Sequence, residues 1–169
     1  MKAFSNNIVY VDTEFTDLNP YTGEILSVGM VKPNGEEFYV EIAYEGEIHP
    51  WVRTNILPTL TGENISRDEA KKKIADFLGA GKPHMVAFVP QYDMVYMVKL
   101  FGTESLPFHW MPIDFASMLF GDGQDPGQMR SERRGVLMHY LGLDGNDYPE
   151  HHALSDARAL KDVWAAMVQ

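Results

Sequence analysis

The stretch IVYVDTEFT, residues 8–16, constrains the fold most, because it places two acids in a run that otherwise has the pattern of a buried strand. Successive side chains of a strand point to opposite faces, so Asp12 and Glu14 would share one face. Two buried carboxylates side by side repel each other and lose hydration, which is unfavourable unless hydrogen bonds or a cation compensate. Either the strand ends at Val11 and the acids lie in a loop, or it continues and their charge is compensated.

The rest of the chain alternates strand and helix patterns. Residues 24–43 predict two strands joined through Asn34-Gly35, a pair typical of hairpin turns. Ser66 and Glu69 form a capping box, which predicts a helix over residues 66–78. Further predicted elements are a strand at 84–89, a helix at 92–100, a strand passing into a helix near Asp114, a helix at 130–142 and a last helix from Ala153, with an irregular connector at 43–62. We therefore expect an α/β fold with a central mixed sheet, in one domain over residues 1–169.

Composition limits what can bind a metal and where the protein acts. The 169 residues include no cysteine, so any metal must be held by oxygen or imidazole ligands. No apolar run has the length of a membrane span, and residues 1–7 lack the apolar core of a signal peptide, so we expect a soluble, cytoplasmic protein. The formal charge of −10 argues against a broad duplex-binding face. A small nucleic-acid site remains compatible with it, because bound divalent cations would dominate the local charge.

Residues far along the chain could complete a site with the acidic pair. Asp93 begins a helix directly after a predicted strand, where open α/β sheets gather ligand groups, although acids are also common in first turns because of the helix dipole. Asp156 lies in the first turn of the last helix, five residues after His151. A histidine can take a proton from water near neutral pH, while an ionised aspartate can bind a metal. The neighbouring His152 is expected to point away, as adjacent side chains do.

The order and spacing of these motifs resemble those of the DEDDh group of 3′-to-5′ exonucleases, which have a ribonuclease-H-like fold. The matching motifs are VDTEF, QYDMVYM and HHALSDARAL, and the last is the most specific. Within this group the chain is most similar to RNase AS-type bacterial exoribonucleases, in which DTEF, GEILSVGMVKPNGEEFYV, WVRTNILPTL, QYDMVYMVKLFG and HHALSDAR run in the same order. The likeness is weakest over residues 102–145, where we align no motif of these relatives.

The resemblance implies an α/β ribonuclease-H-like fold with helices on both faces of the sheet, and a two-metal hydrolase. By position, Asp12, Glu14, Asp93 and Asp156 would hold two Mg²⁺ or Mn²⁺ ions, and His151 would be the general base. In this interpretation Asp12 lies between the ions. The implied reaction is 3′-to-5′ hydrolysis of single-stranded RNA, including adenylate-rich RNA, to nucleoside 5′-monophosphates. The resemblance also implies a homodimer.

Three alternatives stay open from the sequence. The first is a 3′-to-5′ DNA exonuclease of the same superfamily, and the second is a catalytically silent nucleic-acid-binding domain on the same fold. The third is a zinc site built from His139, His151 and His152, but their spacing matches no usual zinc pattern and the surrounding ligands are hard oxygens.

Substrate contacts are predicted beside the acidic pair and in the segment WVRTNILP. Phe15 and Thr16 would line the pocket of the 3′-terminal nucleotide, as the resemblance implies. Trp51 could stack on a base and Arg53 could contact a phosphate, or Trp51 could pack under a loop while Arg53 pairs with an acid. The basic groups that could meet a nucleic-acid backbone, with a solvated helix face as the alternative, are Lys71 to Lys73, Arg130, Arg133 and Arg134.

Overall fold

The computed structural model describes residues 1–129 and 131–168, and within them one six-stranded mixed sheet has the strand order β4-β3-β2-β1-β5-β6. Neighbours β1 and β2, and β2 and β3, are antiparallel, whereas β3–β4, β1–β5 and β5–β6 are parallel. The strands are β1 (Ile8–Phe15), β2 (Ile25–Val31), β3 (Glu37–Ile42), β4 (Asn64–Ile65), β5 (His84–Ala87) and β6 (Ile113–Asp114). The predicted α/β class with a mixed sheet is confirmed.

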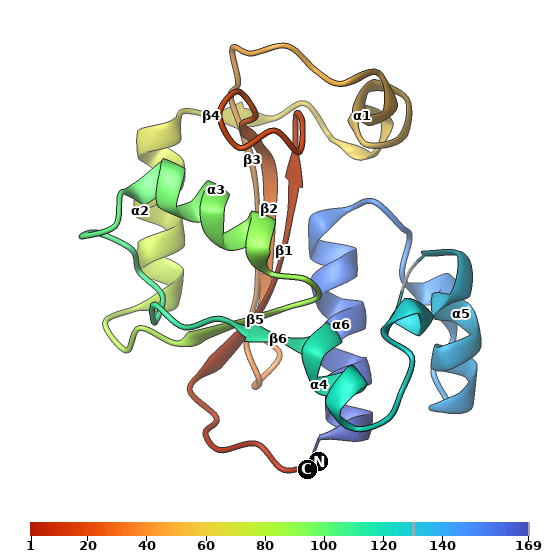
Figure 1. Ribbon diagram of the computed structural model, residues 1–169. Helices are drawn as coiled ribbons and strands as arrows, with labels where there is room; N and C mark the ends of the chain where they lie inside the picture. The colour runs from red at the N-terminus through yellow and green to blue at the C-terminus, as the bar shows by residue number, and fades with distance from the viewer. Residues whose placement is uncertain (130, 169) are drawn as a thin grey trace.

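Helices cover both faces of this sheet (Figure 1). In the figure, α2 and α3 lie on one side of the strands, and α4, α5 and α6 lie on the other, while α1 stands beyond one end of the sheet. The helices are α1 (Pro50–Asn55), α2 (Arg67–Leu78), α3 (Gln91–Phe101), α4 (Phe115–Gly121), α5 (Ser131–Tyr140) and α6 (Ala153–Met167), with 3-10 turns η1 (Leu57–Thr59), η2 (Pro126–Met129) and η3 (Gly145–Asp147).

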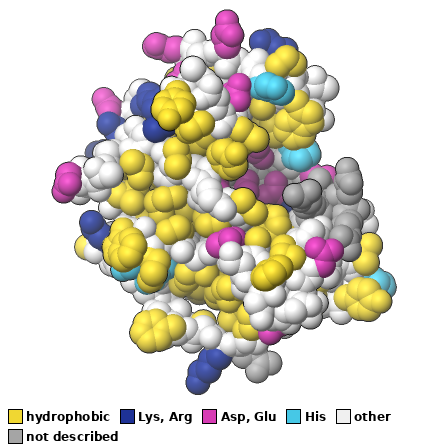
Figure 2. All heavy atoms as spheres, viewed as in Figure 1, with side chains coloured by type: hydrophobic (Ala, Val, Ile, Leu, Met, Phe, Trp, Pro, Cys, Tyr) yellow, Lys and Arg dark blue, Asp and Glu magenta, His cyan; other side chains and the backbone are white. Residues whose placement is uncertain are grey.

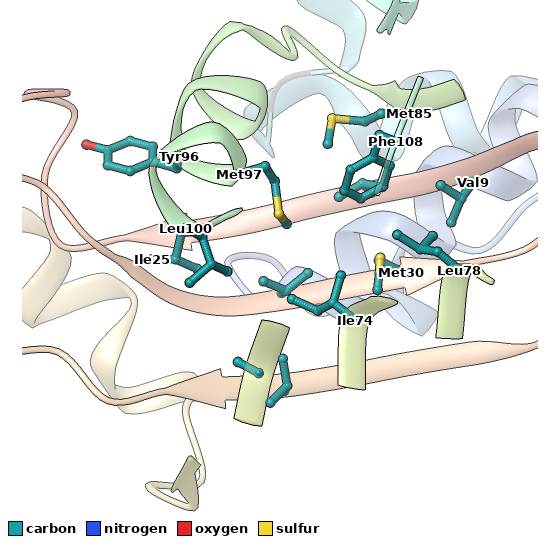
Figure 3. Close-up of a cluster of buried hydrophobic side chains, with 14 of the residues drawn as sticks. Val9, Ile25, Met30, Ile74, Leu78, Met85, Tyr96, Met97, Leu100 and Phe108 are labelled. Carbon is teal, nitrogen blue, oxygen red and sulfur yellow. The ribbon is translucent and has the colours of Figure 1, made fainter. Parts of the chain in front are cut away.

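Two hydrophobic clusters pack the layers onto the sheet. The first joins β1, β2 and β5 to α2 and α3, and includes Val9, Ile74 and Met97 (Figure 3). The second joins the opposite face of β1 to α4, α5 and α6, and includes Tyr10 and Trp164. Alternating residues of β1 therefore face different layers, so the strand can deliver side chains to both.

The elements around the predicted site begin and end close to the predicted positions. The Ser66 side chain accepts a hydrogen bond from the Glu69 backbone N–H, 3.2 Å away, and caps α2 as expected. β1 continues through Asp12 and Glu14 to Phe15, so the alternative in which the strand ends at Val11 is wrong. The connector predicted to be irregular over 43–62 in fact contains α1 and η1.

α6 lies unusually close to β2 because Gly29 has no side chain. A Cβ atom built on Gly29 would lie 2.2 Å from both the Ala153 carbonyl carbon and the Leu154 backbone nitrogen. This contact sets the first turn of α6 directly against the sheet, beside β1. In the described part of the chain, no helix is long and apolar enough to cross a membrane.

Candidate active site

Three carboxylates from opposite ends of the chain converge between the central strand β1 and the first turn of α6. Oxygen atoms of Asp12 and Glu14, on β1, and of Asp156, in the first turn of α6, all lie within 4.8 Å of one another. All three side chains are half-buried. Figure 2 shows acidic side chains gathered in a hollow below α1, with a histidine side chain at its rim. The pair that the strand pattern singled out is therefore joined by the acid predicted from the last helix.

The fourth predicted acid, Asp93, approaches from the opposite layer. It lies in the first turn of α3 and is 6% exposed. Thr13, which lies between the two β1 acids and points to the other face, donates a hydrogen bond to Asp93 Oδ1 over 2.5 Å. Asp93 is not part of the three-residue group defined by the 4.8 Å separation, but its charge raises the pKa values of both Asp12 and Glu14.

Burial raises the pKa values of Asp12, Glu14 and Asp93, and mutual repulsion adds to the rise for Asp12 and Glu14. Burial, followed by the charges of Asp156, Glu14 and Asp93, raises the pKa of Asp12 well above its ordinary value, and Arg134 opposes that rise. Burial together with Asp156 and Asp93 raises the pKa of Glu14 to about 8. Burial raises the pKa of Asp93 to about 6, against the lowering effect of the Thr13 hydroxyl. Without cations the group therefore retains protons near neutral pH.

The donor set fits hard divalent cations. Every ligand atom in the cluster is a carboxylate oxygen, as Mg²⁺ and Mn²⁺ prefer, and a cation would relieve the repulsion that raises the pKa values. Among the described residues, the ring nitrogens of His139, His151 and His152 do not all lie within 4.8 Å of one another. The structure therefore gives the zinc alternative no support.

His151 stands at the rim of the cluster and is held by its surroundings. Its backbone is left-handed, with φ of 61°, and its carbonyl accepts a hydrogen bond from Thr59 Oγ1 over 2.7 Å. The Trp51 ring meets the imidazole edge-on, with ring centroids 5.2 Å apart. His151 also lines a cavity of about 200 Å³ together with Asp12, Asp156 and Glu150. This position is compatible with a proton-accepting role beside the carboxylates.

His152 has a structural environment instead. Its Nδ1 accepts a hydrogen bond from the Ser155 backbone N–H and so caps α6. Its ring stacks on Tyr39, with centroids 4.6 Å apart, and the Tyr39 hydroxyl donates to Glu41. The two adjacent histidines thus have different contacts.

Arg134 is the site residue whose place the sequence did not indicate. It was predicted to meet a nucleic-acid backbone or solvent, yet it is only 8% exposed and its guanidinium donates to Asp156 Oδ1. The sequence did contain a signal, because the apolar residues Leu137 and Met138 follow three and four positions later on the same helix face. Both are buried in the structure. Lys71 and Lys73 pair with acids of their own helix, while Arg130 and the Arg133 side chain lie outside the described residues.

A second cavity, of about 370 Å³, opens beside Glu14. Its lining is mostly apolar, and consists of Glu14, Phe15, Asp17, Leu18, His49, Trp51, Val52 and Ile56. Phe15 and Trp51 therefore line one pocket, and Trp51 is half-exposed rather than packed under a loop. Thr16, predicted to line this pocket, is fully buried outside its lining and accepts a hydrogen bond from the Glu24 backbone N–H. Arg53 is exposed on α1, outside the pocket lining.

Solved structures share this architecture over nearly the whole chain. The nuclease domain of 3′hExo, a DEDDh family member bound to rAMP, matches with a TM-score of 0.67 and 12% identity, covering 98% of this chain and 92% of that chain. Escherichia coli ExoI, in its zinc-bound complex with single-stranded DNA, matches with a TM-score of 0.63 and 14% identity, covering 91% and 38%. A chain of the yeast NOT1 MIF4G–CAF1 complex matches with a TM-score of 0.58 and 11% identity, covering 94% and 77%.

The chain therefore shares the fold of the nuclease domain of 3′hExo, in agreement with the predicted ribonuclease-H-like α/β fold. It is also a distant homologue of the 3′-5′ exoribonuclease Rv2179c of Mycobacterium tuberculosis H37Rv and of the exoribonuclease MT2234.1 of strain CDC 1551, with 32% identity over 105 residues in each case. The match covers 55% of this chain, and the chain spans about 60% of the length of these relatives. No protein-family model matches the chain.

Proposed function

We propose that the chain is a metal-dependent 3′-to-5′ exoribonuclease that acts on single-stranded RNA and releases nucleoside 5′-monophosphates. The observation that carries the proposal is the convergence of Asp12, Glu14 and Asp156 within 4.8 Å, with Asp93 and His151 at its borders. A half-buried, crowded group of like charges is unfavourable without a counter-charge, so its assembly from the first strand and the last helix favours a metal-binding role. The preference for RNA is taken from the names of the mycobacterial relatives.

In this proposal the carboxylates of Asp12, Glu14, Asp93 and Asp156 hold two divalent cations. When bound, Mg²⁺ or Mn²⁺ supplies Lewis-acid stabilisation of the negative charge that develops on the phosphate and on the leaving oxygen. Asp93 reaches the site from α3 with its carboxylate oriented by Thr13.

His151 is the proposed general base. An imidazole nitrogen accepts a proton from a water molecule as the water oxygen attacks the phosphorus of the terminal phosphodiester. The bond from phosphorus to the 3′-oxygen of the preceding nucleotide breaks, and that oxygen takes a proton from solvent. The terminal nucleotide leaves with the phosphate on its 5′-oxygen. Trp51 contacts the His151 ring and Thr59 holds the His151 carbonyl, so the base is oriented before substrate arrives.

The pocket beside Glu14 is the proposed site of the 3′-terminal nucleoside, including adenosine. Its volume of about 370 Å³ lies in the range typical of small-ligand sites, and Phe15 and Trp51 offer aromatic faces for stacking on a base. Arg53, exposed on the same helix as Trp51, would contact a phosphate of the strand. Thr16 would act from below, by holding the Phe15–Asp17 segment against Glu24.

We further propose that residues 1–169 form one catalytic domain that works as a homodimer in the cytoplasm. The single sheet that links residues 8 to 114 supports one domain, and the homodimer is what the resemblance to RNase AS-type exoribonucleases implies. Sedimentation equilibrium of the full chain would give twice the mass of one chain, and a single-chain mass would contradict the dimer.

The activity test uses 5′-labelled single-stranded RNA, poly(A) and single-stranded DNA of equal length, with Mg²⁺, Mn²⁺ or EDTA. We expect a ladder shortened from the 3′ end on RNA, lost in EDTA and in Asp93→Asn. A ladder on DNA alone would favour the DNA exonuclease, and no ladder with either metal would leave only a silent binding domain.

A matched pair of variants tests the base. His151→Asn should slow cleavage by roughly 10²–10⁴-fold, because the proton acceptor is lost. His152→Asn should retain most activity, since asparagine also caps helices. Undiminished cleavage by His151→Asn, or an equal loss in both variants, would overturn the assignment of His151.

A further inference from the structure

Arg134 brings a buried positive charge to the carboxylate cluster. Its guanidinium donates through Nη1 to Asp156 Oδ1 and through Nη2 to the Tyr148 carbonyl over 2.9 Å. The side chain is 9% exposed, against 17% for the Asp156 side chain. It also lines the cavity of about 200 Å³ that contains Asp12 and His151. Arg134 therefore touches one of the proposed metal ligands, Asp156, directly and lines the same cavity as a second, Asp12.

The guanidinium has anchors that do not depend on Asp156. Leu137 and Met138, one helical turn further along α5, are buried in the same cluster as Leu160 of α6. Tyr148, whose carbonyl accepts from Arg134, is itself tied to α6 because its hydroxyl donates to Asp162 Oδ2 over 2.7 Å. Packing and a backbone acceptor thus fix the arginine beside α6.

The contact uses one oxygen of a carboxylate that has two. Asp156 Oδ1 accepts from the guanidinium, and the residue also supplies an oxygen to the 4.8 Å group with Asp12 and Glu14. A hydrogen bond to one carboxylate oxygen restricts rotation of the side chain and so fixes the direction of the other oxygen. Partners of this kind commonly change metal affinity by about 10–100-fold.

We propose that Arg134 is a positioning residue for divalent-cation binding: it holds Asp156 through Oδ1 so that the second oxygen faces Asp12 and Glu14. The inference rests on the proposed metal-dependent function. It differs from a second arrangement, in which the guanidinium occupies the place of a cation and must leave when a metal binds. The Tyr148 anchor favours positioning, because it holds the guanidinium in place whether or not a cation is present. The two arrangements predict opposite changes in metal affinity.

The test is titration of the metal-free full chain with Mn²⁺ by calorimetry, without substrate. Arg134→Met keeps a long side chain but removes both hydrogen bonds, and should weaken Mn²⁺ binding by about tenfold or more. Arg134→Lys keeps the charge but lacks the planar fork that reaches both partners, and should lie between Arg134→Met and the unmodified protein. The matched control is Arg158→Met, which removes an arginine that also lies on a carboxylate, the exposed Glu37, away from the cluster. It should bind Mn²⁺ as the unmodified protein does.

Circular dichroism and melting in EDTA establish that each variant is folded. Unchanged Mn²⁺ affinity in folded Arg134→Met would overturn the positioning role. Tighter Mn²⁺ binding would also overturn it, and would favour the arrangement in which the guanidinium occupies the place of a cation. If Arg134→Met does not fold, Arg134→Lys decides: affinity equal to the unmodified protein overturns the inference, and severalfold weaker binding supports it. Lack of saturable Mn²⁺ binding by the unmodified protein would overturn both this inference and the proposed function, whereas activity without an Arg134 effect would overturn this inference alone.

Discussion

Thr13 connects β1 to the helix layer opposite the one that Asp12 and Glu14 face. Its neighbours Asp12 and Glu14 face α6, while its own hydroxyl reaches the opposite layer and donates to Asp93 over 2.5 Å. Both Thr13 and Asp93 are buried, at 5% and 6% exposure. The hydrogen bond lowers the pKa of Asp93 against the stronger effect of burial. Thr13 therefore favours the ionised form of Asp93.

Replacing Thr13 with valine should destabilise the metal-free protein at pH 8 by about 1.5–3 kcal/mol, because a buried ionised carboxylate loses a donor. Thr13→Ser keeps the hydroxyl and should cost less, about 0.8 kcal/mol for the lost methyl group. The difference in stability between Thr13→Val and Thr13→Ser should become smaller at pH 5, below the Asp93 pKa of about 6, where the carboxyl is protonated. Urea unfolding in EDTA at both pH values measures this. Equal stability of the two variants at pH 8 would show that the hydrogen bond contributes nothing.

At the residue scale, the sequence predicted which acids come together better than it predicted the contacts that hold the site residues in place. Alternation along β1 placed Asp12 and Glu14 on one face, and the structure agrees. The contacts of Arg134 with Tyr148 and of Thr59 with His151 join segments that the sequence does not relate. Such contacts depend on how separate elements pack, and local periodicity carries no information about that.

At the scale of elements, the approach of α6 to β2 determines where Asp156 lies. The Gly29 position has no room for a Cβ atom, since the nearest atoms, 2.2 Å away, belong to the backbone of α6. Backbone cannot rotate aside as a flexible side chain can, so any larger residue must push the helix away.

Gly29→Ala should therefore destabilise the protein by roughly 1–3 kcal/mol or more and weaken Mn²⁺ binding, because α6 would carry Asp156 away from β1. Gly121→Ala, at the end of α4 with no atom within 4 Å of its added Cβ, is the matched control. Thermal melting and Mn²⁺ titration test both variants. A Gly29→Ala protein with unchanged metal affinity would mean that the α6 position does not govern the site.

The elements with strong local signals were predicted well. α2 has its capping box, and α6 has an apolar stripe that is buried in the structure. α1 was missed because it is only 6 residues long and begins with Pro50 after a histidine cap, an unusual start signal. In residues 102–145, the predicted strand passing into a helix near Asp114 corresponds to the two-residue β6 and the short α4.

At the scale of the whole molecule, the acidic site couples stability to pH. Burial and like charges raise the pKa of Glu14 to about 8 and that of Asp93 to about 6, above their ordinary values of 4.5 and 3.8. Between these limits the folded protein binds more protons than the unfolded chain, so stability falls as pH rises. Cations bind the ionised carboxylates and act in the opposite direction.

In EDTA, the melting temperature should fall as pH rises from 5.5 to 8.5, and Mg²⁺ should raise it more at pH 8 than at pH 6. Glu14→Gln should make the metal-free profile shallower and be more stable than the unmodified protein at pH 8, with a gain on the order of 1–4 kcal/mol. Differential scanning fluorimetry across this range, with and without Mg²⁺, provides the measurement. A metal-free melting temperature that climbs with pH would contradict the raised pKa values.

The distribution of the acids along the chain also has a consequence in time. Asp12 and Glu14 belong to the first strand, whereas Asp156 belongs to the last helix. A ribosome that synthesises this chain from its amino end produces Asp12, Glu14 and Asp93 long before His151 and Asp156 exist. The complete site cannot assemble until the last helix has left the ribosome. A growing chain therefore carries only part of the carboxylate cluster until α6 has been synthesised.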